Sequence, residues 1–160
     1  DLATPLEEIP RFVGVLEANS SLQVVLGARV ALLGRRIERR PMRHYLGRVF
    51  ATVASWLLSL PVYDTQCGAK LFRSGDLVRG LFAEPFLSRW IFDVELLARL
   101  VQQRSVDVAR CVVYELPLQR WHDVPGSRLQ ISDFLRAGLE LWRIRRRYLA
   151  VRSGAKRAEP

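Results

Sequence analysis

The sequence predicts a single α/β domain in which strands and helices alternate along the chain. With 160 residues, of which 49% are hydrophobic, the chain can bury a substantial core but holds no more than one domain. Two runs rich in β-branched residues, at 22–26 and 106–118, predict strands. Apolar residues at helical spacing predict helices before, between and after them. We therefore expect one domain over 1–150 and a disordered basic tail at 151–160.

The first helix is expected to start close to the N-terminal end of the sequence. Thr4 is placed to cap it, Pro5 to take its first position and Glu7 to complete a capping box, with Pro10 as a kink or an alternative start. Its apolar stripe is formed by Leu6, Ile9, Val13 and Leu16. The strand at 22–26 then ends at Gly27 and Ala28, directly before Arg29.

A basic tract separates this strand from the next helix. Its arginines are Arg35, Arg36, Arg39, Arg40 and Arg43. One interpretation is a solvated linker, and a second is attraction of the tract to anionic lipid head groups. A third is that Arg29 and Arg43 converge on a phosphate, because guanidinium groups match phosphate oxygens in a bidentate way. The residues alone leave these alternatives open.

The segment 43–60 predicts one helix, which Pro61 stops. Its apolar stripe is formed by Tyr45, Val49, Val53, Trp56, Leu57 and Leu60. The uncharged run at 49–62 is shorter than the roughly twenty residues that span a bilayer. The helix therefore either packs on the domain's own sheet or lies at a membrane interface.

The segment 64–72, with the sequence DTQCGAKLF, predicts a polar loop that feeds a strand. Asp64 and Gln66 supply side-chain oxygens, and Gly68 lets the backbone approach a ligand closely. In the plainest interpretation Asp64 caps backbone groups and Lys70 points to water. Cys67 is expected to be a small packing residue, because no histidine base lies near it in sequence.

The segment 89–97, with the sequence RWIFDVELL, places two carboxylates among apolar residues. We expect helices at 76–82 and 92–103, joined by an irregular connection at 86–90. Asp93 and Glu95 would lie near the start of the second helix, where its dipole favours negative charge. They are about 200° apart around a helix, so they cannot face the same way. At least one of them is therefore expected at the edge of an apolar surface, where carboxylates are kept for pairing or for chemistry. Stabilisation of the helix start alone is the alternative explanation for both.

The segment WHDVPGSRL at 121–129 follows the second strand. Its Gly126, Ser127 and Arg128 combine backbone donors, a hydroxyl and a cation, which suits phosphate binding, although Ser127 can equally be a turn or cap residue. The last helix is expected at 131–149, with Ile131, Leu135, Leu139 and Trp142 on one side. It ends in four arginines, which either stabilise the helix terminus or rest on an anionic membrane face.

These three motifs, in this order, resemble the family 2 glycosyltransferases of the polyprenyl-phosphate branch, and within that branch the dolichyl-phosphate β-glucosyltransferases. The resemblance covers 1–149. It implies the C-terminal portion of a glycosyltransferase A-type fold, a mixed sheet flanked by helices, with the N-terminal nucleotide-binding half missing. The sequence opens on Asp1 as if cut inside a DxD motif, and Ala28 stands where the family's GSR segment has serine.

The resemblance also implies roles for the acidic residues. Asp1 would be the second carboxylate of DxD and would bind Mg²⁺ or Mn²⁺ that bridges the phosphates of a sugar nucleotide. Asp64 would contact the donor sugar or the metal. Asp93 would face the cleft and orient the acceptor phosphate or a sugar hydroxyl, so that Asp64 and Asp93 are the catalytic candidates.

The substrate contacts implied by the resemblance come mainly from basic residues. Arg29 and Arg43 would hold the acceptor phosphate, Gln66 the donor sugar and Lys70 a phosphate. Ser127 and Arg128 would belong to a loop that closes over the site.

The function implied is transfer of a hexose, glucose by resemblance, from a nucleotide sugar such as UDP-glucose to a polyprenyl or dolichyl monophosphate, with inversion. The expected place is the cytoplasmic face of a membrane, with a peripheral attachment. Three alternatives are mannosyl or other sugar transfer to the same lipid, an inactive incomplete lobe, and a basic nucleic-acid-binding domain.

The charge balance bears on the last alternative. The 25 Lys and Arg residues against 16 Asp and Glu give a formal charge of +9, which favours anionic partners. Because no helix-turn-helix, zinc finger or aromatic RNA-binding motif is present, we expect no nucleic acid as a partner. The two cysteines and two histidines match no zinc spacing and no disulfide framework, which predicts a reducing compartment.

Overall fold

The fold is built on a three-stranded mixed sheet. The structure is a computed structural model that describes residues 3–38, 41–122 and 131–150. Strand β1 (Val24–Ala28) lies in the middle, with β3 (Lys70–Phe72) antiparallel on one side and β4 (Val113–Pro117) parallel on the other. The α/β class and the mixed sheet flanked by helices are confirmed.

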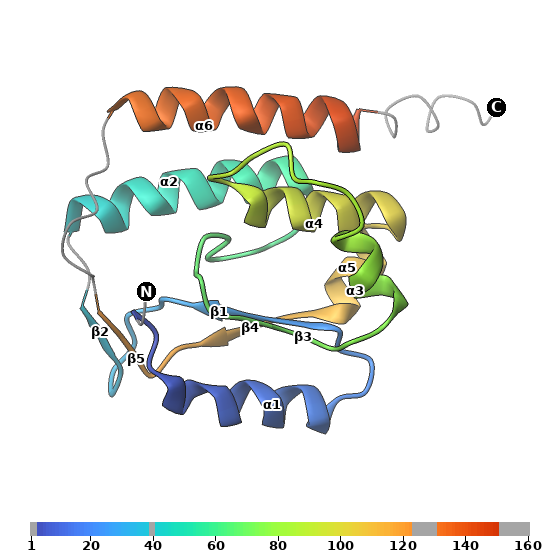
Figure 1. The fold of residues 1–160 in the computed structure, drawn as a ribbon. Coiled ribbons are helices and arrows are strands. Elements are labelled where there is room, and N and C mark those ends of the chain that lie inside the picture. Colours follow the sequence, from blue (N-terminus) through green and yellow to red (C-terminus); the bar gives the residue numbers. More distant parts are fainter. Residues whose placement is uncertain (1–2, 39–40, 123–130, 151–160) are drawn as a thin grey trace.

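Both faces of this sheet are covered, so β1 is buried along its whole length. Helix α1 (Ile9–Ala18) lies on one face, and α2 (Pro41–Leu58) and α4 (Phe92–Gln103) lie on the other (Figure 1). Successive β1 side chains belong alternately to the cores on the two faces of the sheet. Val24 and Leu26 join the core under α2 and α4, whereas Val25 joins the core over α1.

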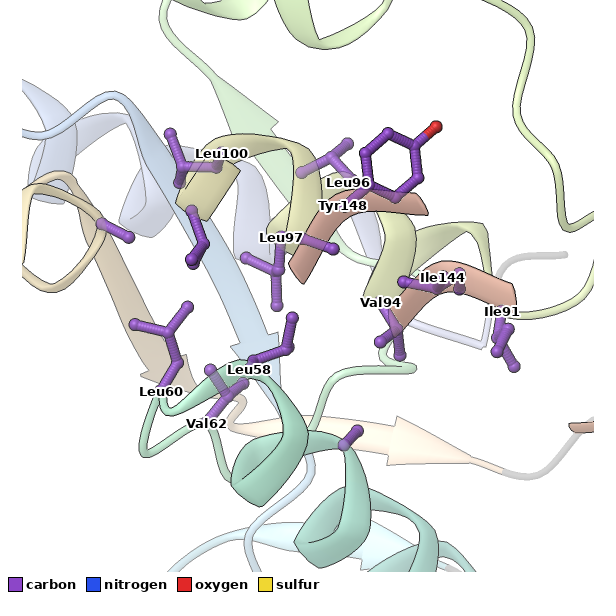
Figure 2. Close-up of a cluster of buried hydrophobic side chains, with 14 of the residues drawn as sticks. Leu58, Leu60, Val62, Ile91, Val94, Leu96, Leu97, Leu100, Ile144 and Tyr148 are labelled. Carbon is purple, nitrogen blue, oxygen red and sulfur yellow. The ribbon is translucent and has the colours of Figure 1, made fainter. Parts of the chain in front are cut away.

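An outer layer is formed by α6 (Ile131–Ile144) and the π-helical turn η2 (Arg145–Leu149), which pack on α4 (Figure 1). Figure 2 shows α4 side chains between those of this layer and those that end α2. The apolar side chains labelled there are all at most 9% exposed: Leu58, Leu60, Val62, Ile91, Val94, Leu96, Leu97, Leu100, Ile144 and Tyr148. Helix α4 is therefore the centre of the larger core.

Short elements complete the described fold. The 3-10 turn η1 (Leu6–Glu8) leads into α1, and α3 (Asp76–Leu81) leads into the irregular segment before α4. Strands β2 (Arg36–Glu38) and β5 (Arg120–His122) pair in parallel as a separate two-stranded sheet. Helix α5 (Val106–Val112) immediately precedes β4.

Two predictions about the elements are partly wrong. The run at 106–118 holds a strand that ends at Pro117, as predicted, but its first half is helix, because the Ser105 hydroxyl accepts a hydrogen bond from Val108 N at 3.2 Å and starts α5. No side-chain cap stands before η1, and α1 starts at Ile9, with Pro10 in its first turn, close to the alternative start. The basic tract is not only a linker, because part of it pairs with β5 as β2.

The apolar stripes of α2 and α6 are also assigned to the wrong side. The predicted α2 stripe is largely exposed, with Tyr45 and Trp56 at 69% and 76%. The buried α2 residues are Phe50, Ala51, Ala54 and Leu58. On α6, Leu139 and Trp142 are exposed, while Ala137, Leu141 and Ile144 face the core. Small residues on the true inner faces conceal the helical pattern, because alanines let the helices approach closely without adding hydrophobicity to the stripe.

A buried polar cluster fastens the outer layer to α4. The fully buried Glu95 carboxylate accepts hydrogen bonds from Arg99 Nη2 and Tyr148 Oη, both at 2.8 Å, and from Ser88 N at 3.0 Å. Arg99 also donates to the carbonyls of Leu81, Glu84 and Pro85. These bonds join α4 to η2 and to the irregular segment that precedes α4. Within the described ranges, no helix combines the length and the hydropathy needed to cross a membrane.

Candidate functional site

The candidate site is assembled where the loop before β3 closes over the end of β1. Gly27 N donates to Ala69 O at 2.8 Å, which continues the β1–β3 pairing into the loop. A Cβ on Gly27 would lie only 3.1 Å from Ala69 Cβ, Ala69 O and Cys67 Sγ. Glycine at this position therefore lets the DTQCGAKLF loop lie directly against the strand that leads into Arg29.

Arg29 and Asp64 form a two-pronged ion pair between these segments. Arg29 Nε lies 2.6 Å from Asp64 Oδ2, and Arg29 Nη2 lies 2.8 Å from Asp64 Oδ1. The backbone N–H of Arg29 also donates to Oδ2 at 3.1 Å. The Arg29 guanidinium lies over the Trp121 ring, 5.2 Å from its centroid. Arg29 is thus held in one place by a carboxylate, a strand end and an aromatic ring.

Lys70 and Asp93 form a second pair, between β3 and the first turn of α4. Lys70 Nζ lies 2.9 Å from Asp93 Oδ1, and both side chains are 8% exposed. The contact is an ion pair without a well-directed hydrogen bond at Oδ1. Lys70 Nζ also donates to the carbonyl of Cys67. Lys70 therefore does not point to water, contrary to the plainest interpretation of the loop.

Burial raises the pKa of the Asp93 carboxyl above its ordinary value, and the Lys70 ammonium opposes that rise. The folded chain consequently holds this proton more tightly than the unfolded chain. The contribution of this group to the free energy of unfolding is fully present below the ordinary aspartate pKa of about 3.9, and it is lost as the pH rises through the folded pKa.

Asp93→Asn should remove this pH dependence, because asparagine does not titrate. We expect the stability of the native chain relative to the variant to fall as the pH rises from about 4 through the raised pKa. Urea unfolding of both proteins over a series of pH values measures the difference. A difference that stays flat, or that grows with pH, would show that burial does not dominate at Asp93.

The two cations reach a common hollow of about 550 Å³. Its polar wall includes Arg29, Gln66, Lys70 and Thr4, and Trp121 closes one side. The apolar part of its wall comes from η1, α1 and the start of β3, with Leu6, Ile9, Phe12 and Leu71. Asp64 and Asp93 do not line it. Arg29 and Lys70 therefore reach the surface of the site, and the carboxylates that hold them lie behind it. Glu8 also lines the hollow, and its carboxylate is paired with Arg11 and accepts hydrogen bonds from the backbone of Gln119 and Arg120.

The predicted site residues fall into three groups. Arg29, Gln66 and Lys70 line the hollow, and Asp64 and Asp93 lie behind it in contact with the cations. The remaining predicted residues, Asp1, Ser127, Arg128 and the side chain of Arg43, lie outside the described residues. The catalytic roles of Asp64 and Asp93 and the convergence of Arg29 with Arg43 stay predictions.

Cys67 is a packing residue, as expected. It is fully buried beside Gly27, and burial raises the pKa of its thiol, so it stays protonated. Two residues at the site were missed from sequence. Trp121 lines the hollow, and the Glu115 carboxylate holds the backbone of the loop. Trp121 opens one of the singled-out motifs, so an aromatic ring beside a candidate phosphate-binding run was a usable signal.

The described residues do not form a complete metal site. Within 3–38, 41–122 and 131–150, no three Asp, Glu, His or Cys side chains gather as they would around a metal ion. Asp64 and Asp93 face Arg29 and Lys70, so the described carboxylates at the site are paired with side-chain cations. The described residues by themselves therefore do not make up a site for a divalent cation, and Asp1, the predicted metal ligand, lies outside them.

Comparison with known proteins places the sequence of this chain in a family. Over 139 residues the chain is 32% identical to a protein of Trichomonas vaginalis named dolichyl-phosphate beta-glucosyltransferase, covering 86% of this chain and 39% of the relative. A human protein of the same name is 32% identical over 142 residues, 88% of this chain and 40% of the relative. One from Dictyostelium discoideum is 30% identical over 154 residues, 93% of this chain and 45% of the relative. The chain belongs to this glycosyltransferase family. It corresponds to the C-terminal part of a family 2 glycosyltransferase.

The chain spans about two fifths of the length of these glycosyltransferase relatives. No family model and no solved structure matches it. Because the matches run over 86–93% of the chain, they extend over the segments that carry both ion pairs.

Proposed function

We propose that the intact protein transfers glucose from a nucleotide sugar, UDP-glucose, to dolichyl or another polyprenyl monophosphate with inversion at the anomeric carbon. The observation that supports this proposal is that two largely buried cations, Arg29 and Lys70, line one hollow together with Gln66. Such a wall suits a ligand that combines phosphate and sugar hydroxyls. The names of the relatives supply the sugar and the acceptor class.

In this proposal an oxygen of the acceptor phosphate attacks the anomeric carbon while the bond from that carbon to the nucleoside diphosphate breaks. A phosphate monoester has a second pKa near 6, so its oxygen is already largely anionic at neutral pH. The protein therefore has little proton transfer to perform. Its residues act by alignment: Arg29 holds an anionic oxygen, Lys70 balances phosphate charge, and Gln66 contacts the sugar.

The carboxylates behind the hollow keep the cations in place. Asp64 fixes the guanidinium of Arg29 through two contacts, and Asp93 fixes the ammonium of Lys70. Fixed charges need no rearrangement during the reaction, which is where electrostatic catalysis gains its effect. A divalent cation, Mg²⁺ or Mn²⁺ with Asp1 as a ligand, is part of the proposal and would neutralise the leaving diphosphate.

The test is a transfer assay on the purified intact protein with dolichyl phosphate and either UDP-glucose or GDP-mannose. We expect glucosylated lipid from UDP-glucose only, with the β-anomer formed from the α-linked donor, and loss of activity in a metal chelator that added Mg²⁺ or Mn²⁺ reverses. Mannosylated product would replace the proposed donor. No transfer from either donor would refute the function.

We also propose that the α2–α6 side of the molecule rests on a membrane surface. Exposed apolar side chains on α2, among them Val49 and Trp56, are 65% and 76% exposed. On α6 the half-exposed Trp142 carries Arg146 over its ring at 4.9 Å. Interfacial helices combine such aromatic and basic side chains. Flotation with phosphatidylserine vesicles should fall for a Trp56→Ser/Trp142→Ser variant, and equal flotation of the variant would refute this surface.

A further inference from the structure

A glutamate on β4 holds the backbone on which the candidate site depends. Glu115 pairs in register with Leu26 of β1, so it lies one strand away from the segment that ends in Arg29. Its Oε2 accepts a hydrogen bond from Tyr63 N at 2.7 Å, and its Oε1 accepts one from Asp64 N at 2.9 Å. One carboxylate thus binds two successive backbone N–H groups.

These two bonds set the direction of the Asp64 side chain. The Asp64 carboxylate meets Arg29 Nε, Nη2 and N at 2.6, 2.8 and 3.1 Å. A two-pronged contact of this kind tolerates little movement of either partner. Arg48 secures the same short segment from its other side, because it donates to the Tyr63 carbonyl and lies 3.6 Å from the centroid of the Tyr63 ring.

The chemistry of the carboxylate explains why a glutamate is suited to this place. An ionised carboxylate only accepts hydrogen bonds, whereas an amide or a protonated carboxyl would turn a donor toward one of the two N–H groups. Burial raises the pKa of Glu115, the nearby Asp64 charge adds to the rise, and the two backbone bonds and Arg48 oppose it. The contacts to the backbone, together with the Arg48 charge, are therefore the interactions that favour its charged form.

We propose that Glu115 is a positioning residue for the transfer reaction: it fixes residues 63–64 so that Asp64 holds the Arg29 guanidinium at the hollow. This inference rests on the proposed function, because Arg29 is there assigned to the acceptor phosphate. In this arrangement Glu115 of β4 supports the loop, the loop supports Arg29, and Arg29 contacts the ligand.

The test compares Glu115→Gln, Asp64→Asn and the double variant in the intact protein. Glu115→Gln should raise the KM for dolichyl phosphate about tenfold, the effect of a buried donor left without its acceptor, with a smaller change in the KM for UDP-glucose. Because both residues act through Arg29, the double variant should be no worse than the more impaired single variant. Glu115→Asp, which keeps an acceptor-only group, should be intermediate, and it replaces Glu115→Gln if that variant does not fold.

A second readout does not need activity. The Nε–H resonance of Arg29, assigned by its disappearance in Arg29→Lys, should be resolved in the ¹H–¹⁵N spectrum of the wild type and should shift or broaden in Glu115→Gln. Glu140→Gln is the matched control. Glu140 lies on α6, outside the hollow, and its carboxylate accepts a hydrogen bond from Ser88 Oγ at 2.5 Å. This variant should leave both the KM and the resonance unchanged.

The outcomes separate the two proposals. An unchanged Arg29 resonance in Glu115→Gln and Glu115→Asp overturns the positioning role, whether or not the wild type transfers glucose. Multiplicative KM effects in the double variant, or a loss of thermal stability with unchanged KM, also overturn it. An inactive wild type whose Arg29 resonance still depends on Glu115 refutes the proposed function and leaves the positioning of Arg29 in place.

Discussion

Replacing Arg99 by methionine should lower the free energy of unfolding by about 3–5 kcal/mol, the usual cost of removing one partner from a buried ion pair. Arg99 is 3% exposed, and its Nη2 lies 2.8 Å from Oε1 of the fully buried Glu95. Methionine fills a similar volume but leaves Glu95 with the hydrogen bonds from Tyr148 and Ser88 and without an opposing charge.

The double variant Glu95→Gln/Arg99→Met is the matched comparison, because it removes both charges. It should recover part of the loss, since no unpaired charge then stays buried. Urea unfolding of the three proteins measures the three free energies. If Arg99→Met costs less than about 1 kcal/mol, a range typical of exposed pairs, the cluster does not fasten the outer layer to α4.

Replacing Lys70 by methionine should lower kcat/KM for glucosyl transfer by about 10² to 10³, the range for removing one fixed charge from a catalytic site. Lys70 is the cation of the hollow that comes from β3, and its ammonium is fixed by Asp93 at 2.9 Å. Its loss also removes the main opposition to the burial of Asp93, so the pKa of Asp93 should rise further.

The control for Lys70→Met is Arg79→Met. Arg79 forms an ion pair with Asp76 at 2.5 Å in which both side chains are largely exposed, at 68% and 94%. Such pairs contribute little, so neither activity nor stability should change measurably. Steady-state kinetics with both substrates test the prediction. If Lys70→Met keeps wild-type kcat/KM, its charge has no part in the transfer and the assignment of the hollow is wrong.

The helix α4 could be predicted to the residue, and the reason is local. Its apolar residues at 96, 97 and 100 follow a helical repeat, and both carboxylates lie in its first turn. The α5–β4 boundary could not, because the same β-branched residues continue across it and only the Ser105 cap separates helix from strand. On α2, bulky residues such as Tyr45 and Trp56 lie on the exposed side, and two of the four buried residues are alanines, so hydrophobicity alone selected the wrong face.

The candidate site divides in a similar way. Arg29, Gln66 and Lys70 could be named from the motifs, and the structure brings them to one hollow. That Asp64 pairs with Arg29 and Asp93 with Lys70 could not be predicted, because each pair joins segments whose distance depends on sheet pairing. Glu115 was missed for the same reason. A glutamate in a strand usually marks a solvent-facing position, and only the loop folded against β4 gives it two backbone partners.

In the proposed reaction, Arg29 holds the phosphate of the lipid acceptor. The most direct measurement is the pair of KM values, for dolichyl phosphate and for UDP-glucose, of the intact protein and its Arg29→Ala variant. We expect the KM for dolichyl phosphate to rise at least about tenfold in the variant, as for a lost charge-assisted contact, while the KM for UDP-glucose changes far less. An equal rise in both values, or a rise for UDP-glucose alone, would contradict it.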